Sequence, residues 1–513
     1  MSLWSILDRA RHLHPTRPAV GDDGRTLSYA ELGTRVDALA HRLIELGAAP
    51  GDRVAVLLPN GLAYLESYFA AAGAGLILVP LNTRLTATEL GFILRDSGST
   101  LLLADPALAD LACAALSEAP EVGRIVWAGA IPEQRGGAPG TTWPEPTGRR
   151  FAAVTTPMDG VAHLYYTSGT TGPPKGVMLT HRNVWVHAMA AIAELDLKEA
   201  DVWGHVAPMF HLADAWATFA ITWAGGRHVM VPRFEPGEVL ATLEREAITI
   251  TNLVPTMLNL MVKHPAARDR RYPRLRRILS GGAPIAPAVV EAIINVFGCE
   301  YVQTYGMTET SPYLTLSLLK HHLRALPPAG QLRYQAKTGR PFLSVELRVV
   351  DDSGAPVPAD ECAVGEIQVR GETVTPGYWR RPDATAAAFT PDGWLRTGDL
   401  AVIDSEGYVS IVDRMKDMII TGGEKVYSTE VEAVLYQHPG ILEAAVYGSA
   451  DDTWGEVVSA AVVPRDGARL TEAEVVEFCR PLLAGFKLPR RVRFLAELPK
   501  TGSGKILKRA LAG

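Results

Sequence analysis

The chain has 513 residues, 47% of them hydrophobic and 21% charged, and a formal net charge of −6. A single hydrophobic core stops growing at roughly 250 to 300 residues, so the length predicts at least two domains. The composition excludes a disordered or fibrous protein. The weak negative charge provides no basic field for a phosphate backbone, so we do not expect nucleic acid as a partner, and small-molecule chemistry is favoured.

The cysteines and the N-terminal residues indicate the compartment. The cysteines show neither the paired spacing of a metal site nor a disulfide framework, which suits a reducing environment. They are Cys113, Cys299, Cys362 and Cys479. Asp8, Arg9 and Arg11 stand where a signal peptide needs an apolar run, and the longest apolar stretch, residues 69–80, is too short to span a bilayer. We therefore expect a cytoplasmic protein with at most peripheral membrane contact; the oligomeric state is left open, a homodimer included.

The first hundred residues alternate between helical and strand patterns. Ser28 and Glu31 form a capping-box pattern, and apolar residues follow at helical spacing until Gly47, which predicts a helix between them. Apolar runs then predict strands at residues 54–58, 76–79 and 100–103 and a helix at residues 62–72. Strands that alternate with helices indicate a parallel α/β sheet.

The middle of the chain departs from this alternation twice. Residues 131–150 are rich in Pro and Gly without periodicity, which predicts a surface excursion before a strand at residues 161–167. Between residues 345 and 370, β-branched runs alternate with turn residues, which predicts an antiparallel β subdomain with short turns.

The C-terminal part has its own pattern of elements, which follows a polar stretch at residues 414–417. The pattern predicts helices at residues 428–436 and 472–483 and strands at residues 444–447 and 458–463. About a hundred residues suffice for an independent core. We therefore predict a large α/β domain with the antiparallel subdomain at residues 1–414, and a small, mobile α+β domain at residues 415–513.

Residues 166–176 read YTSGTTGPPKG and directly follow a predicted strand. Glycines and small hydroxyl side chains leave N–H and O–H groups to surround phosphate oxygens, and Lys175 adds positive charge. The spacing differs from a Walker A loop, and Pro173 and Pro174 would disrupt a helix immediately after the loop. The segment therefore predicts phosphate binding outside the P-loop class; by composition alone, a solvent-exposed turn is the alternative.

This loop resembles the phosphate loop of the AMP-forming adenylate synthetase superfamily, which includes acyl-CoA synthetases, peptide-synthetase adenylation domains and firefly luciferase. Further segments resemble the family in the same order. They are residues 280–284 (SGGAP), 303–309 (QTYGMTE), 365–371 (GEIQVRG), 394–400 (WLRTGDL), 413–432 (DRMKDMIITGGEKVYSTEVE) and 499–505 (PKTGSGK). The resemblance covers nearly the whole chain, and among the branches it is to bacterial fatty-acyl and aryl-CoA ligases.

The resemblance implies ATP and Mg²⁺ as cofactors, coenzyme A as cosubstrate, and a reaction in two halves. A carboxylate attacks the α-phosphorus of ATP to give acyl-AMP and pyrophosphate; a thiolate then attacks the mixed anhydride, and AMP leaves. Between the halves the C-terminal domain rotates about a hinge, which is Lys416 by motif position. Gly423 then lines the tunnel for the pantetheine arm, where a thin chain passes the backbone, and Lys425 lies near it.

The resemblance also assigns contacts to the nucleotide and the metal. Tyr305 offers a flat face to adenine, and Thr308 a hydroxyl to the α-phosphate. Glu309 and Thr170 are the predicted metal ligands. The other predicted cofactor contacts are Thr167, Ser168, Gly169, Thr170, Thr171, Lys175, Gly281, Gly282, Ala283, Gln303, Thr304 and Gly306, with Arg233 for the CoA nucleotide.

Asp399 and Arg414 are the predicted ribose contacts, since a carboxylate can accept hydrogen bonds from both hydroxyls. Taken alone, these residues have plain structural alternatives. Asp399 and Arg414 could form a surface ion pair worth roughly 0 to 1 kcal/mol, and Tyr305 could be a core aromatic residue. Their positions in the matched motifs favour the functional interpretation.

Lys505 is the predicted catalytic lysine. A frayed tail is the alternative for GSGK near a C-terminus, but Ile506 and Leu507 after it indicate a packed element. The resemblance implies that Lys505 bridges the carboxylate and the adenylate in the first half reaction. A cation placed where charge develops contributes roughly 3 to 4 kcal/mol to catalysis.

Residues 209–211 (MFH) resemble the aromatic family motif near the acyl pocket, and His211 is a candidate for a direct role. Some long-chain members carry a gating Trp four positions after this His, where Ala215 stands here. The pocket candidates by family position are His211, Trp216, Val254, Thr256, Gly282, Gly306, Met307 and Tyr313. This mostly apolar set favours an aliphatic or aromatic acid over an amino acid, and we interpret Asp214 as a solvated or capping residue.

We therefore predict an AMP-forming acyl-CoA ligase for a fatty or aromatic acid. An enzyme that loads a carrier protein is the first alternative; no fused carrier domain follows Lys505, which favours free CoA. A luciferase-like oxygenase has the same fold with another second step. An inactive acyl or nucleotide sensor is the alternative from another class, and the intact set Thr308, Glu309, Asp399, Arg414 and Lys505 opposes it.

Overall fold

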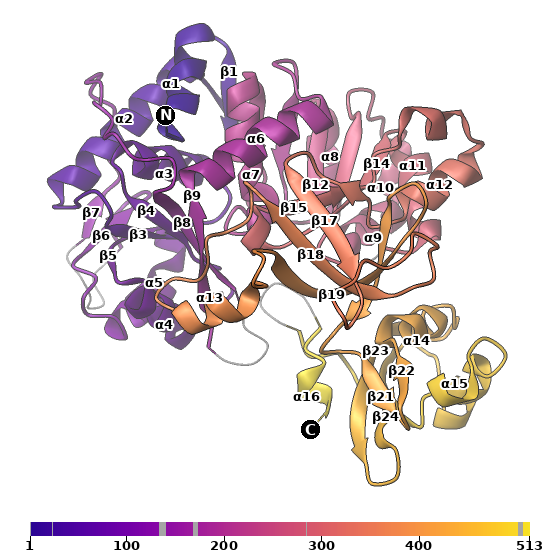
Figure 1. Cartoon of the computed structure of the whole chain (residues 1–513). Coiled ribbons are helices and arrows are strands. Elements are labelled where there is room, and N and C mark those ends of the chain that lie inside the picture. The colour runs from indigo at the N-terminus through magenta and orange to yellow at the C-terminus, as the bar shows by residue number, and fades with distance from the viewer. Residues whose placement is uncertain are drawn as a thin grey trace. The chain divides into compact units, whose positions relative to one another are not determined.

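The computed structural model describes residues 2–22, 24–132, 140–167, 173–283, 285–500 and 506–512 (Figure 1). Its contacts divide the chain into two compact units. The first unit holds Met1–Leu347 and Val369–Leu395, and the second holds Arg348–Gln368 and Arg396–Gly513. The chain therefore passes between the units three times, and the domain border after Arg414 stays a prediction.

Two sheets form the centre of the first unit. One has the order β7 (Gly140–Thr142), β6 (Arg124–Trp127), β5 (Ser99–Ala104), β3 (Arg53–Leu57), β4 (Ile77–Pro80), β8 (Val161–Thr167) and β9 (Lys175–Thr180). The other has the order β16 (Arg340–Pro341), β15 (Tyr313–Leu316), β14 (Glu300–Gly306), β13 (Arg277–Ser280), β12 (Ile250–Leu253), β10 (Val202–His205), β11 (Arg227–Met230), β1 (Pro18–Asp22) and β2 (Arg25–Ser28). Most neighbours run parallel. The antiparallel pairs are β8 with β9, β14 with β15, β15 with β16, and β1 with β2. The predicted parallel α/β sheet is thus confirmed.

Helices cover both faces of each sheet in the first unit, in layers that Figure 1 shows. The largest buried cluster joins one face of both sheets to α1 (Trp4–Leu13), α2 (Tyr29–Glu45), α3 (Leu62–Gly73), α6 (His181–Leu195) and α7 (Leu212–Ala224). The outer face of the β14 sheet packs on α8 (Pro236–Arg245), α9 (Pro255–Lys263) and α11 (Pro287–Phe297). The outer face of the β5 sheet packs on α4 (Ala87–Ser97) and α5 (Ala109–Ser117). The result is an α/β/α/β/α stack.

The second unit contains two smaller sheets. One has the order β17 (Val345–Val350), β18 (Gly365–Gly371), β19 (Leu395–Ile403) and β20 (Val409–Arg414). The other has the order β22 (Glu424–Val426), β21 (Ile419–Thr421), β24 (Gly455–Pro464) and β23 (Ile441–Asp451), with β25 (Arg491–Phe494) beside β24. Apolar residues of α14 (Ser428–Leu435) and α15 (Glu472–Cys479) share a buried cluster with this sheet, and α16 (Arg509–Ala512) follows at the C-terminus. The fold class is that predicted.

Most of the predicted elements lie where the pattern places them. Ser28 caps α2 in a complete capping box with Glu31. The last predicted helix ends early, at Cys479, and the strand predicted at residues 444–447 is the middle of the longer β23. Within the predicted surface excursion, residues 140–142 form the short strand β7 at the edge of a sheet. Three residues are too few to show periodicity.

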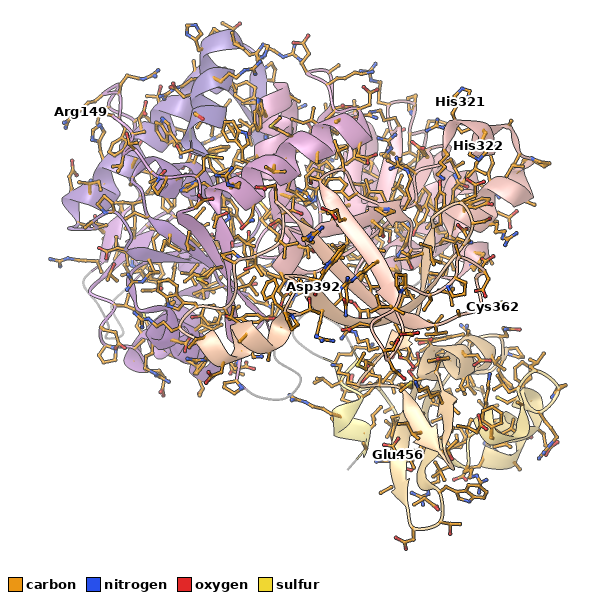
Figure 2. The ribbon with its side chains drawn as sticks, in the orientation of Figure 1. Arg149, His321, His322, Cys362, Asp392 and Glu456 are labelled. Atoms are coloured by element: carbon orange, nitrogen blue, oxygen red, sulfur yellow. The ribbon has the colours of Figure 1, made fainter. Side chains whose placement is uncertain are left out.

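Two further expectations concern the surroundings of the chain. None of the helices in the described part of the chain combines the length and apolar character that crossing a bilayer needs. All four cysteines are free thiols. Cys299 and Cys479 are buried, and Cys362 is exposed (Figure 2).

Candidate active site

Most of the predicted nucleotide and acyl residues of the first unit lie just after the carboxyl ends of strands in the sheet that contains β14. These carboxyl ends form one edge of the sheet. Strands β10 to β14 are parallel, so their carboxyl ends meet at this edge. Gly306 ends β14, Gly281 follows β13, Val254 follows β12, and the exposed Arg233 comes shortly after β11. Open α/β sheets bind ligands at the carboxyl ends of their strands. The fold thus brings together candidates that are distant in sequence.

Two glycines at this edge are required by close packing. A Cβ on Gly281 would lie 2.4 Å from Thr304 Oγ1, and one on Gly306 would lie 1.8 Å from the Pro312 carbonyl oxygen. Polar side chains hold the same loops: Thr304 Oγ1 donates to the Ser280 carbonyl at 3.1 Å, and Gln303 Nε2 donates to the Ala283 carbonyl at 3.2 Å. Gln303 and Thr304, predicted as direct contacts, therefore support the loop that follows β13.

Gly282 follows with a φ of +85°, a conformation that favours glycine. Gly282 and Ala283 are exposed, and Tyr305 and Thr308 are half-buried. These groups form the accessible part of the edge. A core position for Tyr305 is thereby disfavoured.

The predicted phosphate loop joins two antiparallel strands. Thr167 ends β8 and faces Lys175, which begins β9. The chain after the loop is a strand, whereas a Walker A loop leads into a helix. Four residues predicted in this loop, Ser168, Gly169, Thr170 and Thr171, lie outside the described residues.

Glu309 lies in the short 3₁₀ turn Thr308–Thr310. Its carboxylate is largely buried, with 7% of the residue exposed, and the Tyr378 hydroxyl donates to Glu309 Oε1 at 2.9 Å. The Lys175 ammonium lies 5.1 Å from the centre of the Tyr378 ring. A predicted metal ligand and a predicted phosphate contact thus share one neighbour.

This arrangement fits a Mg²⁺ ion whose ligands come partly from the protein and partly from the nucleotide phosphates. Within the residues that the structure describes, no group of three or more His, Cys, Asp and Glu side chains could hold a metal ion. Mg²⁺ in phosphate-transfer sites takes one or two carboxylates and fills its shell with phosphate oxygens and water. One buried, oriented carboxylate at Glu309 meets that need.

Two of the acyl candidates belong to α7: His211 is its N-cap residue, and Trp216 lies in its first half. Asp214 corrects our interpretation, because it is fully buried and neither solvated nor a cap. Trp203 Nε1 donates to Asp214 Oδ1 at 3.2 Å, and His205 Nδ1 lies 2.5 Å from Oδ2. His205 Nε2 in turn lies 2.9 Å from Nδ1 of the buried His228. Both carboxylate oxygens of Asp214 therefore have partners on strand β10.

A buried group of rings packs beside this network. Trp216 lies next to Tyr313, with ring centres 5.2 Å apart, and next to Trp203 at 5.0 Å. His187 contacts Trp216 and Tyr313, at 5.6 and 5.2 Å. Burial lowers the pKa of His187 to about 3, so the imidazole is neutral. Trp216 and Tyr313 therefore lie in a buried group of rings beside an uncharged imidazole.

The predicted ribose contacts of the second unit face each other. Asp399 on β19 pairs with Arg414 on β20, and Asp399 Oδ1 lies 3.4 Å from Arg414 Nε. The hinge candidate Lys416 follows β20 and is exposed. Gly423 has a φ of +88° in the tight turn between β21 and β22, with open space where a side chain would stand. Lys425 Nζ lies 3.1 Å from Asp352 Oδ2.

Lys505 lies outside the described residues, but the chain around it is anchored. Ile506 is half-buried and bridges to Lys500, and Leu507 N donates to the Pro499 carbonyl at 2.8 Å. The chain after Lys505 is therefore packed.

A polar network holds the same segment from the side of Lys508. Its Nζ lies 2.7 Å from Glu432 Oε1 and 2.6 Å from Ser428 Oγ. Ser428 Oγ donates to Asp413 Oδ1 at 3.0 Å. Burial raises the pKa values of Glu432 and Asp413, and the Lys508 charge opposes the shift. Asp413 directly precedes the ribose candidate Arg414, so the network connects two functional motifs.

Sequence reasoning missed Tyr378, Lys508 and the His205–His228 pair. Tyr378 lies seven residues past a matched motif, in a Gly-Tyr-Trp run whose aromatic residues were a signal available in the sequence. Lys508 lies three residues past Lys505 in a charged tail. The two histidines sit in separate strands and gave no signal at all.

Comparison with known proteins shows the family of the chain. The family described as AMP-binding enzyme matches residues 7–379, and the family of the AMP-binding enzyme C-terminal domain matches residues 430–505. A feruloyl-CoA synthase of Amycolatopsis sp is 41% identical over 98% of this chain and 97% of its own length. A long-chain-fatty-acid–CoA ligase of Thermus thermophilus is 39% identical over 100% of this chain and 95% of its own. The o-succinylbenzoate CoA synthetase of Bacillus subtilis, solved with ATP and magnesium, has a TM-score of 0.85 and 31% identity, with 100% of both chains covered.

The chain belongs to the AMP-binding enzyme family, the AMP-forming adenylate synthetases. Within this family it is an AMP-forming acid–thiol ligase of the acyl-CoA synthetase type. ATP and Mg²⁺ are the cofactors of this class, and coenzyme A is its cosubstrate.

Proposed function

We propose that this acyl-CoA ligase acts on an apolar carboxylic acid, aliphatic or aromatic, without an α-amino group. The observation that carries the proposal is the burial of Asp214. Its two oxygens are engaged by Trp203 and His205, so it does not offer a counter-ion to a substrate ammonium. The rings of Trp216 and Tyr313 next to it favour an apolar acyl group. The two full-length relatives named above carry an aromatic and a long-chain acid in their names.

In the proposed first half reaction, Tyr305 stacks on adenine, and Thr308 and Lys175 contact the phosphates. An oxygen of the carboxylate attacks the α-phosphorus, and the bond to the pyrophosphate oxygen breaks. Glu309 and Thr170 would hold Mg²⁺, which supplies charge neutralisation on the phosphates when bound. Lys505 places its ammonium where negative charge develops. His211, at the start of α7, would orient the carboxylate.

In the proposed second half, the CoA thiolate attacks the carbonyl carbon of acyl-AMP, and AMP leaves. Asp399 and Arg414 hold the ribose in both halves. We further propose the domain border after Arg414, the hinge at Lys416, the pantetheine passage at Gly423 near Lys425, and a CoA nucleotide contact at Arg233. The exposure of Lys416 and the open space at Gly423 support these roles.

The experiment is pyrophosphate release from the purified protein with ATP and magnesium, over aliphatic, aryl and amino acids, each with and without CoA. We expect CoA-dependent turnover with one apolar class and none with amino acids. Pyrophosphate release at the same rate with and without CoA would support a carrier protein as acceptor. Turnover of an amino acid would contradict the role of Asp214. No pyrophosphate release with any acid of the panel would favour the inactive sensor.

A further inference from the structure

Residues 372–379, called the strap from here on, connect the strand after the phosphate loop to the turn that carries Glu309. The backbone N–H of Trp379 donates to the Gly176 carbonyl at 2.8 Å. The backbone N–H of Thr375 donates to the Glu309 carbonyl at 2.8 Å. The strap is thus fixed by main-chain hydrogen bonds to both elements.

Tyr378 is the strap residue whose side chain reaches both functional groups. Its hydroxyl donates to Glu309 Oε1 at 2.9 Å, and its ring centre lies 5.1 Å from Lys175 Nζ. The phenol is therefore the hydrogen-bond donor, and the carboxylate oxygen is its acceptor.

We propose that Tyr378 is a positioning residue for adenylate formation: its hydroxyl orients the Glu309 carboxylate for the magnesium of MgATP, and its ring restrains the Lys175 ammonium. The inference rests on the proposed roles of Glu309 and Lys175. The hydroxyl and the ring of one side chain thus contact Glu309 and Lys175, which lie 134 positions apart in the sequence.

Each part of this role has a chemical precedent. A carboxylate that ligates a metal is itself held by hydrogen bonds, and loss of such a partner typically costs about 10- to 100-fold in metal affinity. A cation over an aromatic ring gains about 0.5 to 1 kcal/mol at exposed sites, which is roughly two- to fivefold in binding. The two parts are therefore separable by substitution.

The test is calorimetric binding of ATP, without any acid, over a series of Mg²⁺ concentrations. In Tyr378→Phe the ring stays and the hydroxyl is lost, so we expect the Mg²⁺ concentration for half-maximal enhancement of ATP binding to rise about tenfold. Tyr378→Leu should show the same shift, and additionally a two- to fivefold weaker binding of ATP without Mg²⁺. Tyr29→Phe is the matched control, because the Tyr29 hydroxyl donates to the Gly226 carbonyl at 2.5 Å, outside the site.

Glu309→Gln separates this inference from the function on which it rests. If Glu309→Gln raises the Mg²⁺ requirement and Tyr378→Phe does not, the positioning role of Tyr378 is wrong. A Glu309→Gln variant with the wild-type requirement would instead overturn the proposed metal role. If Tyr378→Phe and Tyr29→Phe weaken binding equally at every Mg²⁺ concentration, Tyr378 is only structural. Equal binding by the Phe and Leu variants without Mg²⁺ would overturn the part played by the ring.

Discussion

The candidate residues of the two units differ in how they are held. In the first unit Glu309, Gln303 and Thr304 are 7%, 6% and 4% exposed, and the side chain of each forms a hydrogen bond within the same unit. In the second unit Arg414, Lys416, Gly423 and Lys425 are all exposed. Buried polar groups keep fixed partners, whereas exposed ones can exchange them at little cost. The difference suits the proposed reaction, in which Lys416, Gly423 and Lys425 belong to the part that moves between the halves, while Arg414 keeps its ribose contact in both.

The largest effect that would sharpen this comparison is expected at Lys505. Lys505→Ala should lower adenylate formation about 10²- to 10³-fold, because a cation at the developing charge is lost. Thioester formation from supplied acyl-AMP should stay within a few-fold of the wild type. Pyrophosphate exchange measures the first half, and AMP release with CoA and synthetic acyl-AMP measures the second. An equal loss in both halves would contradict the two-conformation proposal.

The next effect concerns stability at the anchored end of the second unit. Lys508→Met removes the cation from a largely buried carboxylate, Glu432, and should lower the free energy of unfolding by about 3 kcal/mol. Chemical denaturation measures this change. Lys487→Met is the matched control, since Lys487 Nζ lies 2.7 Å from Glu430 Oε1 on the same helix but at a more exposed position. The control should cost less than about 1 kcal/mol; equal costs would show that the network has no special role.

The first unit should respond to acid. Burial lowers the pKa of His163 and of His187 to about 3 in the folded protein, compared with 6.5 in the unfolded chain. The unfolded state therefore takes up protons as pH falls below 6.5 while the folded state does not, and stability is lost. Between pH 7.5 and pH 5.5 the two residues together should cost roughly 2.5 kcal/mol.

The measurement is the unfolding free energy of wild type and His163→Phe at both pH values. The Phe variant should lose about half of this acid-dependent part, since its ring replaces an imidazole that stacks on Phe219. His12→Gln, at an exposed position, should leave the pH dependence unchanged. A wild-type slope in His163→Phe would mean that other groups account for the acid sensitivity.

The smallest of the four effects is expected at Gly423. Gly423→Leu should lower CoA-dependent thioester formation at least about tenfold by filling open space, while adenylate formation stays within about threefold. The paired assays used for Lys505 measure both halves. Gly467→Leu is matched for backbone strain, since its φ is +79° and its side-chain position is also open. If both Leu variants slow the same half equally, strain and not obstruction is the cause.

How much the sequence could predict depended on whether a residue acts through its neighbours in the chain or through distant ones. The capping box at Ser28 and the strand before the phosphate loop follow from local patterns, and both were predicted. Asp214 was misinterpreted, because its position at the start of a helix suggests a cap or a solvated residue. Its burial is decided by Trp203 and His205, which come from strand β10.

The candidate site divides in the same way. Glu309, Asp399 and Arg414 lie in motifs from which their roles could be predicted. The pairing of β19 with β20 places Asp399 and Arg414 opposite each other. Tyr378 gains its importance from Glu309 and Lys175, neither of which is near it in the chain. Composition and periodicity do not predict contacts between residues that are distant in the chain. The role of Tyr378 was therefore found from the folded structure.

The three passages of the chain between the units affect how the protein can be divided into fragments. No single cut separates the units, because Arg348–Gln368 belongs to the second unit while Val369–Leu395 returns to the first. A fragment of residues 1–414 keeps all four strands from β17 to β20, whereas one that stops at residue 347 loses most of this sheet. Recombinant halves, split reporters and domain exchanges between relatives should therefore be joined after Arg414, even though the compact units divide elsewhere.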